Sequence, residues 1–126
     1  MAKDTEHFKV SEFACKHCGE NKIDQRVINM SEEIRKKLGV PVHVNSGYRC
    51  EIHNKNVGGV KGSKHTKGFA ADLSCELGSP AMKKAVQDLR NEGKLQDLDY
   101  CIKYGKKNFI HIDCGGKRNN LYEDRP

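Results

Sequence analysis

Residues 63–72 read S-K-H-T-K-G-F-A-A-D, and the predicted fold is built outward from this stretch. It supplies an imidazole at His65 and a carboxylate at Asp72, with Gly68 between them and small residues around the acid. Both side chain types bind zinc, and both bind it better when a turn and a short strand hold them rigid. The stretch therefore indicates half of a metal site. A single His that caps a loop and a single Asp in a turn would look the same, so this interpretation needs a third ligand.

Alternation of side chains predicts a strand over residues 69–75. Its core face would consist of the apolar residues at every second position, Phe69, Ala71, Leu73 and Cys75. On the opposite face Asp72 lies between the small residues Ala70 and Ser74, which leaves room for a ligand above the sheet.

A second strand near the end of the chain supplies the missing ligand. Residues 108–114 read N-F-I-H-I-D-C, and their alternation separates an apolar face from a face that carries His111 and Asp113. The apolar face consists of Ile110, Ile112 and Cys114. Two His and one Asp, with a fourth position free for water, are the composition of a catalytic zinc site rather than of a closed structural one.

Three segments together resemble the M15 family of zinc peptidases. They are S-x-H-x-x-G-x-A-x-D at 63–72, H-x-D at 111–113, and S-G-Y-R-C at 46–50, which is followed by His53 and Asn54. The family includes D-alanyl-D-alanine carboxypeptidases and phage endolysins that cut the peptide stems of peptidoglycan, and it shares its fold with hedgehog signalling domains. The matching segments span roughly residues 8 to 115.

The resemblance implies a role for several side chains. His65, Asp72 and His111 would hold the catalytic Zn²⁺, and Arg49 would face the substrate, where a guanidinium on a fixed turn suits a carboxylate or a developing oxyanion. Ser63 resembles a family position that contacts substrate, although capping of the turn would also explain it.

The general base is the position at which the sequence departs from the family. In endolysin-like members an acid or a His lies three residues before the last metal ligand, and here that residue is Asn108, which cannot accept a proton. Asp113 is the substitute, because it shares a strand face with His111. Orientation of a metal-bound His111 is an equally good interpretation of Asp113, and His53 is held in reserve as the base.

The remaining pattern predicts one α+β domain over residues 1–126, with a small central, mainly antiparallel sheet flanked by helices, as in the hedgehog/DD-peptidase fold. Helices are expected over 24–38, where Asp24 and Gly39 fit the two ends, and over 79–93. Further strands are expected over 42–44 and 98–104, with a single helical turn over 51–57 and a hairpin turn through 105–107. The tail, about 116–126, is polar and is expected to be mobile.

The cysteines indicate a possible second metal site. Cys15 and Cys18 form C-x-x-C within the N-terminal segment 1–23, and Cys50 and His53 form C-x-x-H. Together they have the spacing of a four-ligand structural zinc knuckle. A disulfide from Cys50 to Cys15 or Cys18 is the alternative, and His53 would then be free to line the cleft. The remaining cysteines are expected to be small buried residues.

Composition limits the partners and the compartment. The net charge is +6 and 36% of the residues are apolar. This positive charge favours polyanions such as a cell wall, while the scattered Lys and Arg residues make nucleic acid an improbable partner. No apolar run has the length of a membrane span or of a signal peptide. We therefore expect a monomer made in the cytoplasm that reaches the cell wall after phage-type lysis or by separate export.

The sequence thus predicts a zinc metallopeptidase that hydrolyses peptidoglycan stem peptides, as a carboxypeptidase or as an endopeptidase. A non-catalytic zinc-containing module that binds cell wall or another ligand is the first alternative. A zinc-knuckle nucleic-acid binder is the second.

Overall fold

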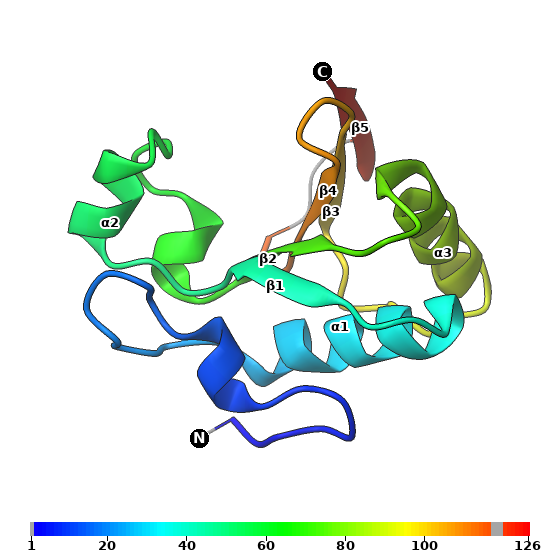
Figure 1. Cartoon of the computed structure of the whole chain (residues 1–126), viewed down its shortest axis with the longest axis horizontal. Coiled ribbons are helices and arrows are strands. Elements are labelled where there is room, and N and C mark those ends of the chain that lie inside the picture. Colours follow the sequence, from blue (N-terminus) through cyan, green and yellow to red (C-terminus); the bar gives the residue numbers. More distant parts are fainter. Residues whose placement is uncertain (1, 117–119) are drawn as a thin grey trace.

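The computed structural model describes residues 2–116 and 120–126 and contains a five-stranded sheet with helices packed against it (Figure 1). The strands lie in the order β1-β2-β4-β3-β5. Their bounds are His43–Ser46 for β1, Ala70–Ser74 for β2, Tyr100–Tyr104 for β3, Phe109–Asp113 for β4 and Tyr122–Arg125 for β5. The helices are α1 (Gln25–Leu38), α2 (Glu51–Asn56) and α3 (Ser79–Asn91), with short 3-10 helices η1 (Val10–Phe13) and η2 (Lys64–Lys67).

The predicted α+β class is confirmed, but the sheet is mixed. Neighbouring strands from β1 to β3 pair antiparallel, whereas β5 pairs parallel to β3, with Cys101 opposite Tyr122. The pattern of residues 116–126 predicts no strand, because these residues are polar and lack a clear alternation. In the structure β5 is a strand at the edge of the sheet and pairs with β3. This pairing is made by backbone hydrogen bonds, so it does not require an alternation of apolar side chains. Residues 117–119 of the predicted mobile tail lie outside the described residues.

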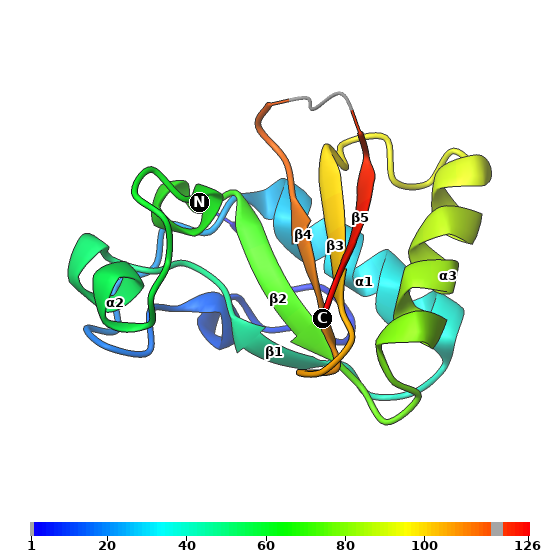
Figure 2. The same ribbon diagram turned by 90° about the horizontal axis from the view of Figure 1, so that it is seen from above.

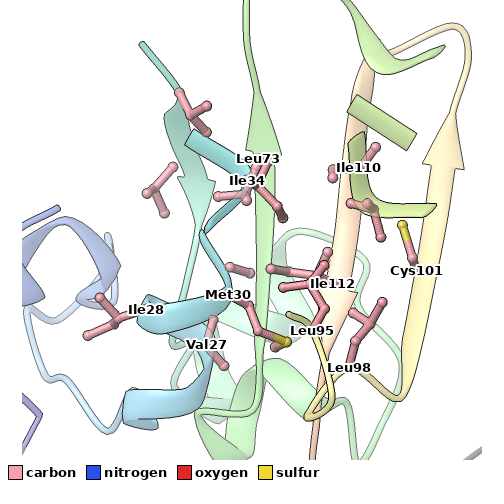
Figure 3. Packing of buried hydrophobic residues seen from close by; sticks show 14 of the residues in the cluster. Val27, Ile28, Met30, Ile34, Leu73, Leu95, Leu98, Cys101, Ile110 and Ile112 are labelled. Atoms are coloured by element: carbon pink, nitrogen blue, oxygen red, sulfur yellow. The ribbon is translucent and has the colours of Figure 1, made fainter. Parts of the chain in front are cut away.

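One face of the sheet packs against α1 and α3, which also contact each other. Figure 3 shows side chains of α1 lying against those of the central strands, among them Ile34, Leu73 and Ile112. All three are fully buried, and burial of each such side chain contributes roughly 1.5–3 kcal/mol relative to exposure. The core therefore lies on the helix side, and the other face of β2 and β4 is left for function.

Helix α1 begins and ends where the sequence predicts. The Asp24 carboxylate accepts a hydrogen bond from the backbone N–H of Arg26, and Gly39 adopts a left-handed conformation with φ of 71° at the other end. Both arrangements satisfy backbone groups that the helix itself leaves unpaired.

Helix α2 lies at the opposite end of the molecule from α3, next to the loop that leads into η2 (Figure 2). None of the helices in residues 2–116 and 120–126 has both the length and the apolar character needed to cross a membrane.

Candidate metal centre and cleft

The sheet brings Asp72 and His111 together, although they are 39 residues apart in the chain. They are directly opposed partners on the antiparallel strands β2 and β4, so their side chains project from the same face. His65 reaches the same point from η2. One ligand atom from each of these three residues lies within 4.8 Å of the corresponding atoms of the other two. The predicted metal ligands therefore form one cluster.

The hydrogen bond at the far side of the His65 ring defines which nitrogen can bind a metal. Its Nδ1 lies 2.8 Å from the carbonyl oxygen of Gly47, and a carbonyl only accepts, so Nδ1 carries the proton. Nε2, which lies 3.3 Å from Oδ1 of Asp72, is therefore the nitrogen that is left to bind a metal. A backbone partner on the second nitrogen is the usual way in which proteins orient a metal-binding His.

His111 is oriented in the opposite sense by Asp113. Its Nε2 lies 2.7 Å from Oδ2 of Asp113, and its Nδ1 lies 3.0 Å from Oδ1 of Asp72. With Nε2 donating to Asp113, Nδ1 is the nitrogen that faces the cluster. The ring of His111 also meets the edge of His65, with 5.1 Å between centroids, and the edge of Tyr100, with 6.3 Å between centroids.

The hydrogen bonds within the cluster shift the pKa values of Asp72 and His111. Burial by itself would raise the pKa of the Asp72 carboxyl, but hydrogen bonds from His111 and His65 hold that pKa well below its usual range. Burial would likewise lower the pKa of His111, and the carboxylates of Asp113 and Asp72 raise it instead. The same arrangement that stabilises an imidazolium in the metal-free protein would stabilise a divalent cation at this point.

The donor set fits zinc. Nε2 of His65, Nδ1 of His111 and Oδ1 of Asp72 are borderline or hard donors of the kind that zinc prefers, and three protein ligands leave a position open. The ligands are buried or nearly so, with 4%, 13% and 10% of their side chains exposed, in that order. A metal bound here would be shielded from most of the solvent.

Arg49 lies beside the cluster and contacts the outer oxygen of the carboxylate. Its Nη2 donates to Oδ2 of Asp72 at 3.1 Å, its Nη1 to Oδ1 of Asn54 at 3.2 Å, and its Nε to Oγ of Ser46 at 2.9 Å. Beyond a register irregularity between Val44 and Ser46, the end of β1 pairs with Asp72 through Ser46. Arg49 therefore fixes the second oxygen of Asp72 and leaves Oδ1 for the cluster.

A cleft of about 550 Å³ opens over the cluster. Its walls include Arg49, Ser63, Asp113 and the exposed residues Val57 and Val60 of the glycine-rich loop before η2. Ser63 lines the cleft, and its Oγ accepts a hydrogen bond from the backbone N–H of His65 at 3.2 Å. The capping interpretation of Ser63 therefore has a contact in the structure, and the substrate role stays a prediction.

Asn108 serves the fold rather than the cleft. It adopts a φ of 57° in the turn before β4, and its Oδ1 accepts a hydrogen bond from the backbone N–H of Ser79 at 2.8 Å. Gly78, the residue before α3, offers no side chain for this purpose. Asn108 therefore caps α3 from another part of the chain, and it is not among the cleft-lining residues.

The structure also brings together three of the four residues of the predicted knuckle. The sulfurs of Cys15, Cys18 and Cys50 lie within 4.8 Å of one another, and all three cysteines are free. Burial would raise the pKa of Cys15, yet backbone N–H donors, first that of Cys50, lower it to about 7. His53 contacts Cys50 through its backbone N–H, at 3.3 Å from Sγ, and the rings of His53 and His17 are both outside the group within 4.8 Å.

Sequence reasoning missed several groups that support the site. Asn54 is 3% exposed, and its amide joins Arg49 to the carbonyl of Val60. A Cβ at Gly59 would lie 2.0 Å from the Asn54 side chain, so this close approach requires a glycine. The H-N pair and the glycines after it are therefore the sequence pattern that could have indicated the role of Asn54. Tyr100 faces the cleft beside His111 because it alternates with the buried Cys101, and it contacts Glu123 of β5.

Comparison with known proteins gives consistent matches. A family model described as Peptidase M15 matches residues 6–113. Zinc D-Ala-D-Ala carboxypeptidase of Streptomyces albus G is 43% identical over 53 residues, which are 42% of this chain and 20% of that protein. Peptidoglycan L,D-endopeptidase MepK of Escherichia coli K12 is 32% identical over 105 residues, which are 77% of this chain and 54% of that protein. The chain thus spans about half, or less, of the length of these relatives.

Proposed function

The chain belongs to the peptidase M15 family, and on that premise we propose that it is a zinc-dependent peptidase that hydrolyses stem peptides of peptidoglycan. The observation that carries the proposal is the convergence of His65, Asp72 and His111 at the floor of a cleft. The names of the curated relatives, a carboxypeptidase and an endopeptidase of peptidoglycan, support the substrate class.

The proposed metal ligands are Nε2 of His65, Oδ1 of Asp72 and Nδ1 of His111. The chemistry expected from bound zinc is Lewis acidity, which activates a water molecule and polarises the carbonyl of the peptide bond. The protein contributes orientation: the carbonyl of Gly47 and the carboxylate of Asp113 each fix one imidazole, and Arg49 fixes the carboxylate.

Asp113 is proposed to move the proton. Its Oδ2 is occupied by His111, but its Oδ1 is buried without a hydrogen-bond partner in the described parts of the chain. The other carboxylate of the site, Asp72, has both oxygens engaged. Oδ1 of Asp113 therefore accepts the proton of the attacking water and returns it to the leaving amine, which is the role that Asn108 cannot fill.

Arg49 is proposed to bind the substrate carbonyl or carboxylate at the cleft. Its three N–H groups described above already hold the guanidinium rigid, and the guanidinium has five N–H donors in total. A rigid donor at the edge of the metal cluster is suited to the negative charge that develops on a carbonyl oxygen during hydrolysis.

The cleft is suited to an acidic peptide. Its lining includes the cations Arg49, Lys64, Lys107 and Arg125, whereas its two site carboxylates are already paired with His or Arg. Stem peptides of peptidoglycan carry carboxylates, and a positive rim attracts them over a range of about 8–10 Å at physiological salt. The exposed side chains of Val57 and Val60 add apolar surface for their methyl groups.

The proposal is tested by incubating the zinc-loaded protein with purified peptidoglycan and with soluble stem peptides. New amino groups are expected from the wild type and are expected to be absent with His65→Ala, while His43→Ala, an exposed His on β1, is the matched control. The masses of the products distinguish removal of one terminal residue from internal cleavage. Binding of wall fragments without release of amines would instead support a non-catalytic module.

A further inference from the structure

Away from the cleft cluster, the free thiols of Cys15, Cys18 and Cys50 form a group of three. A disulfide would use two of them and leave the third without a role, whereas a tetrahedral metal ion uses all of them. Sulfur ligands at about 2.3 Å from one zinc ion lie about 3.8 Å apart. The three sulfurs already lie within 4.8 Å of one another, so small side chain adjustments bring them to that spacing.

Cys15 and Cys18 are presented by a tight turn. The backbone N–H of Cys15 donates to the carbonyl of Glu20 at 2.7 Å, and the N–H of Gly19 donates to the carbonyl of Cys15 at 2.9 Å. Gly19 has a φ of 78°, a conformation that glycine adopts without steric cost. The C-x-x-C pair is thus closed into a hydrogen-bonded turn, and this spacing is the one at which two cysteines bind a single zinc ion.

Cys50 faces this turn from the start of α2. Its backbone N–H donates to Sγ of Cys15 at 3.4 Å, and its own Sγ accepts from the N–H of His53 at 3.3 Å. These two contacts, together with the spacing of the sulfurs, place Cys50 at the C-x-x-C turn.

A fourth donor is available from His17. Its Nδ1 lies 3.6 Å from Sγ of Cys50, and a sulfur and a nitrogen bound to one tetrahedral zinc ion lie about 3.6 Å apart. The ring of His53 stacks on that of His17, with 6.2 Å between centroids and an interplanar angle of 8°. The contact of His17 with a cysteine sulfur therefore favours it over His53, which the spacing alone had suggested.

We infer that Cys15, Cys18, Cys50 and His17 bind a second, structural zinc ion. This ion joins the N-terminal segment to the segment that supports the cleft cluster. Arg49 immediately precedes Cys50, and the carbonyl of Gly47 orients His65. The two segments already touch, because a Cβ at Gly47 would lie 2.5 Å from the carbonyl oxygen of Phe13.

The role of such an ion is to hold the Gly47–Cys50 backbone in place behind the ligands. Without it, the segment would depend on a few hydrogen bonds, such as the one from Tyr48 N–H to the Phe13 carbonyl at 2.8 Å. Groups that support ligands from behind influence metal affinity by about 10- to 100-fold.

The first test counts metal ions in protein purified under reducing conditions. The wild type is expected to hold two zinc ions per chain, and both Cys18→Ser and the double variant His65→Ala/His111→Ala are expected to hold one. Cys18 is exposed, so its replacement leaves the core unchanged, and Cys75→Ser is the control that keeps two. A double variant without metal would overturn the inference, as would a Cys15–Cys50 disulfide in the reduced preparation.

The second test separates this site from the peptidase proposal. Cobalt bound to the double variant is expected to show a thiolate-to-cobalt charge-transfer band, which Cys18→Ser in the same background removes. No peptidase activity is needed for this signal. His17→Ala is expected to weaken zinc binding there at least about 10-fold, and a larger loss with His53→Ala would overturn the assignment of His17.

Discussion

At the scale of single residues, the site depends on hydrogen bonds that fix each ligand in one state. Gly47 and Asp113 select opposite nitrogens of His65 and His111, and Arg49 selects one oxygen of Asp72. All three supporting groups hold their ligands before a metal arrives. Such preorganisation is what distinguishes a metal site from a chance cluster of polar side chains.

Replacement of Asp113 by Asn tests its proposed proton transfer. The amide keeps the shape of the side chain but cannot accept the proton, so kcat is expected to fall by about 10²- to 10⁴-fold. Zinc content, measured by elemental analysis, is expected to remain close to that of the wild type. If metal is lost in parallel with activity, Asp113 acts only by positioning His111; unchanged kcat would contradict both roles.

Lys107 offers a test of substrate charge. It lines the cleft, is exposed and follows another exposed lysine, Lys106, that does not line it. Lys107→Glu is expected to raise KM for an acidic stem peptide about 3- to 10-fold, with kcat nearly unchanged and the effect reduced at high salt. Lys106→Glu changes the net charge equally, so an equal rise in KM for both variants would contradict a local role.

At the scale of secondary-structure elements, the sheet register accounts for most of the site. Antiparallel pairing of β2 and β4 places Asp72 opposite His111. Alternation in the sequence predicts both strands, and it also predicts which of their side chains share a face. The η2 turn, which carries His65, ends at Gly68 with φ of 78°. A Cβ there would lie 1.9 Å from the carbonyl oxygen of Lys22, which explains the glycine inside the ligand motif.

Asn108 links two elements, and its replacement is expected to affect stability without affecting catalysis. Asn108→Ala removes the cap of α3 and replaces Asn, which tolerates a positive φ, by a residue that tolerates it less well, and the two effects together cost about 1–2 kcal/mol of unfolding free energy. Asn108→Gly loses only the cap and should cost less. Urea denaturation measures both values. A large loss of kcat in the folded Asn108→Ala protein would show that the residue acts in the reaction.

Some of the site could not have been read from the sequence. Asn108 was recognised as unable to act as a base, but its contact with Ser79 joins positions 29 residues apart and leaves no local signal. Asn54 has only an indirect signal, the H-N pair and the glycines after it, because its partners are defined by the path of a loop. Strand β5 was missed because its residues are polar, and it pairs at the sheet edge through its backbone.

At the scale of the whole molecule, long-range contacts fasten the N-terminal segment to the helical layer. The buried carboxylate of Glu32 on α1 accepts a hydrogen bond from the backbone N–H of His7 at 2.7 Å, and its other oxygen lies 2.6 Å from Nδ1 of His7. Farther along this segment, the carbonyl of Phe13 accepts a hydrogen bond from Tyr48 N–H, and Sγ of Cys15 accepts one from Cys50 N–H. The residues around the cleft are thus supported both by the sheet and by the N-terminal segment.

Glu32 makes the attachment sensitive to acid. Burial alone would raise the pKa of its carboxyl, but the hydrogen bonds from His7 lower that pKa below its usual value. A carboxylate whose pKa is lowered by folding stabilises the fold at pH values above its unfolded pKa of about 4.3. This contribution is lost as the pH falls below that pKa and through the lowered pKa of the folded state. Glu32→Gln is therefore expected to lower the unfolding free energy by about 1–3 kcal/mol at pH 7.

The comparison of Glu32→Gln with the wild type at two pH values checks the sign. The difference in unfolding free energy, measured with urea, is expected to shrink between pH 7 and pH 3. Glu33→Gln, on the same helix but without a described contact to His7, serves as the control. A difference that grew at low pH would contradict the assigned direction of the pKa shift.

The central claim is that three distant side chains share one metal ion, and anomalous X-ray diffraction at the zinc absorption edge tests it most directly. For crystals of the zinc-loaded protein, we predict a peak about 2.0–2.2 Å from Nε2 of His65, Nδ1 of His111 and Oδ1 of Asp72. Zinc-loaded crystals with no anomalous peak among these three atoms would contradict the account.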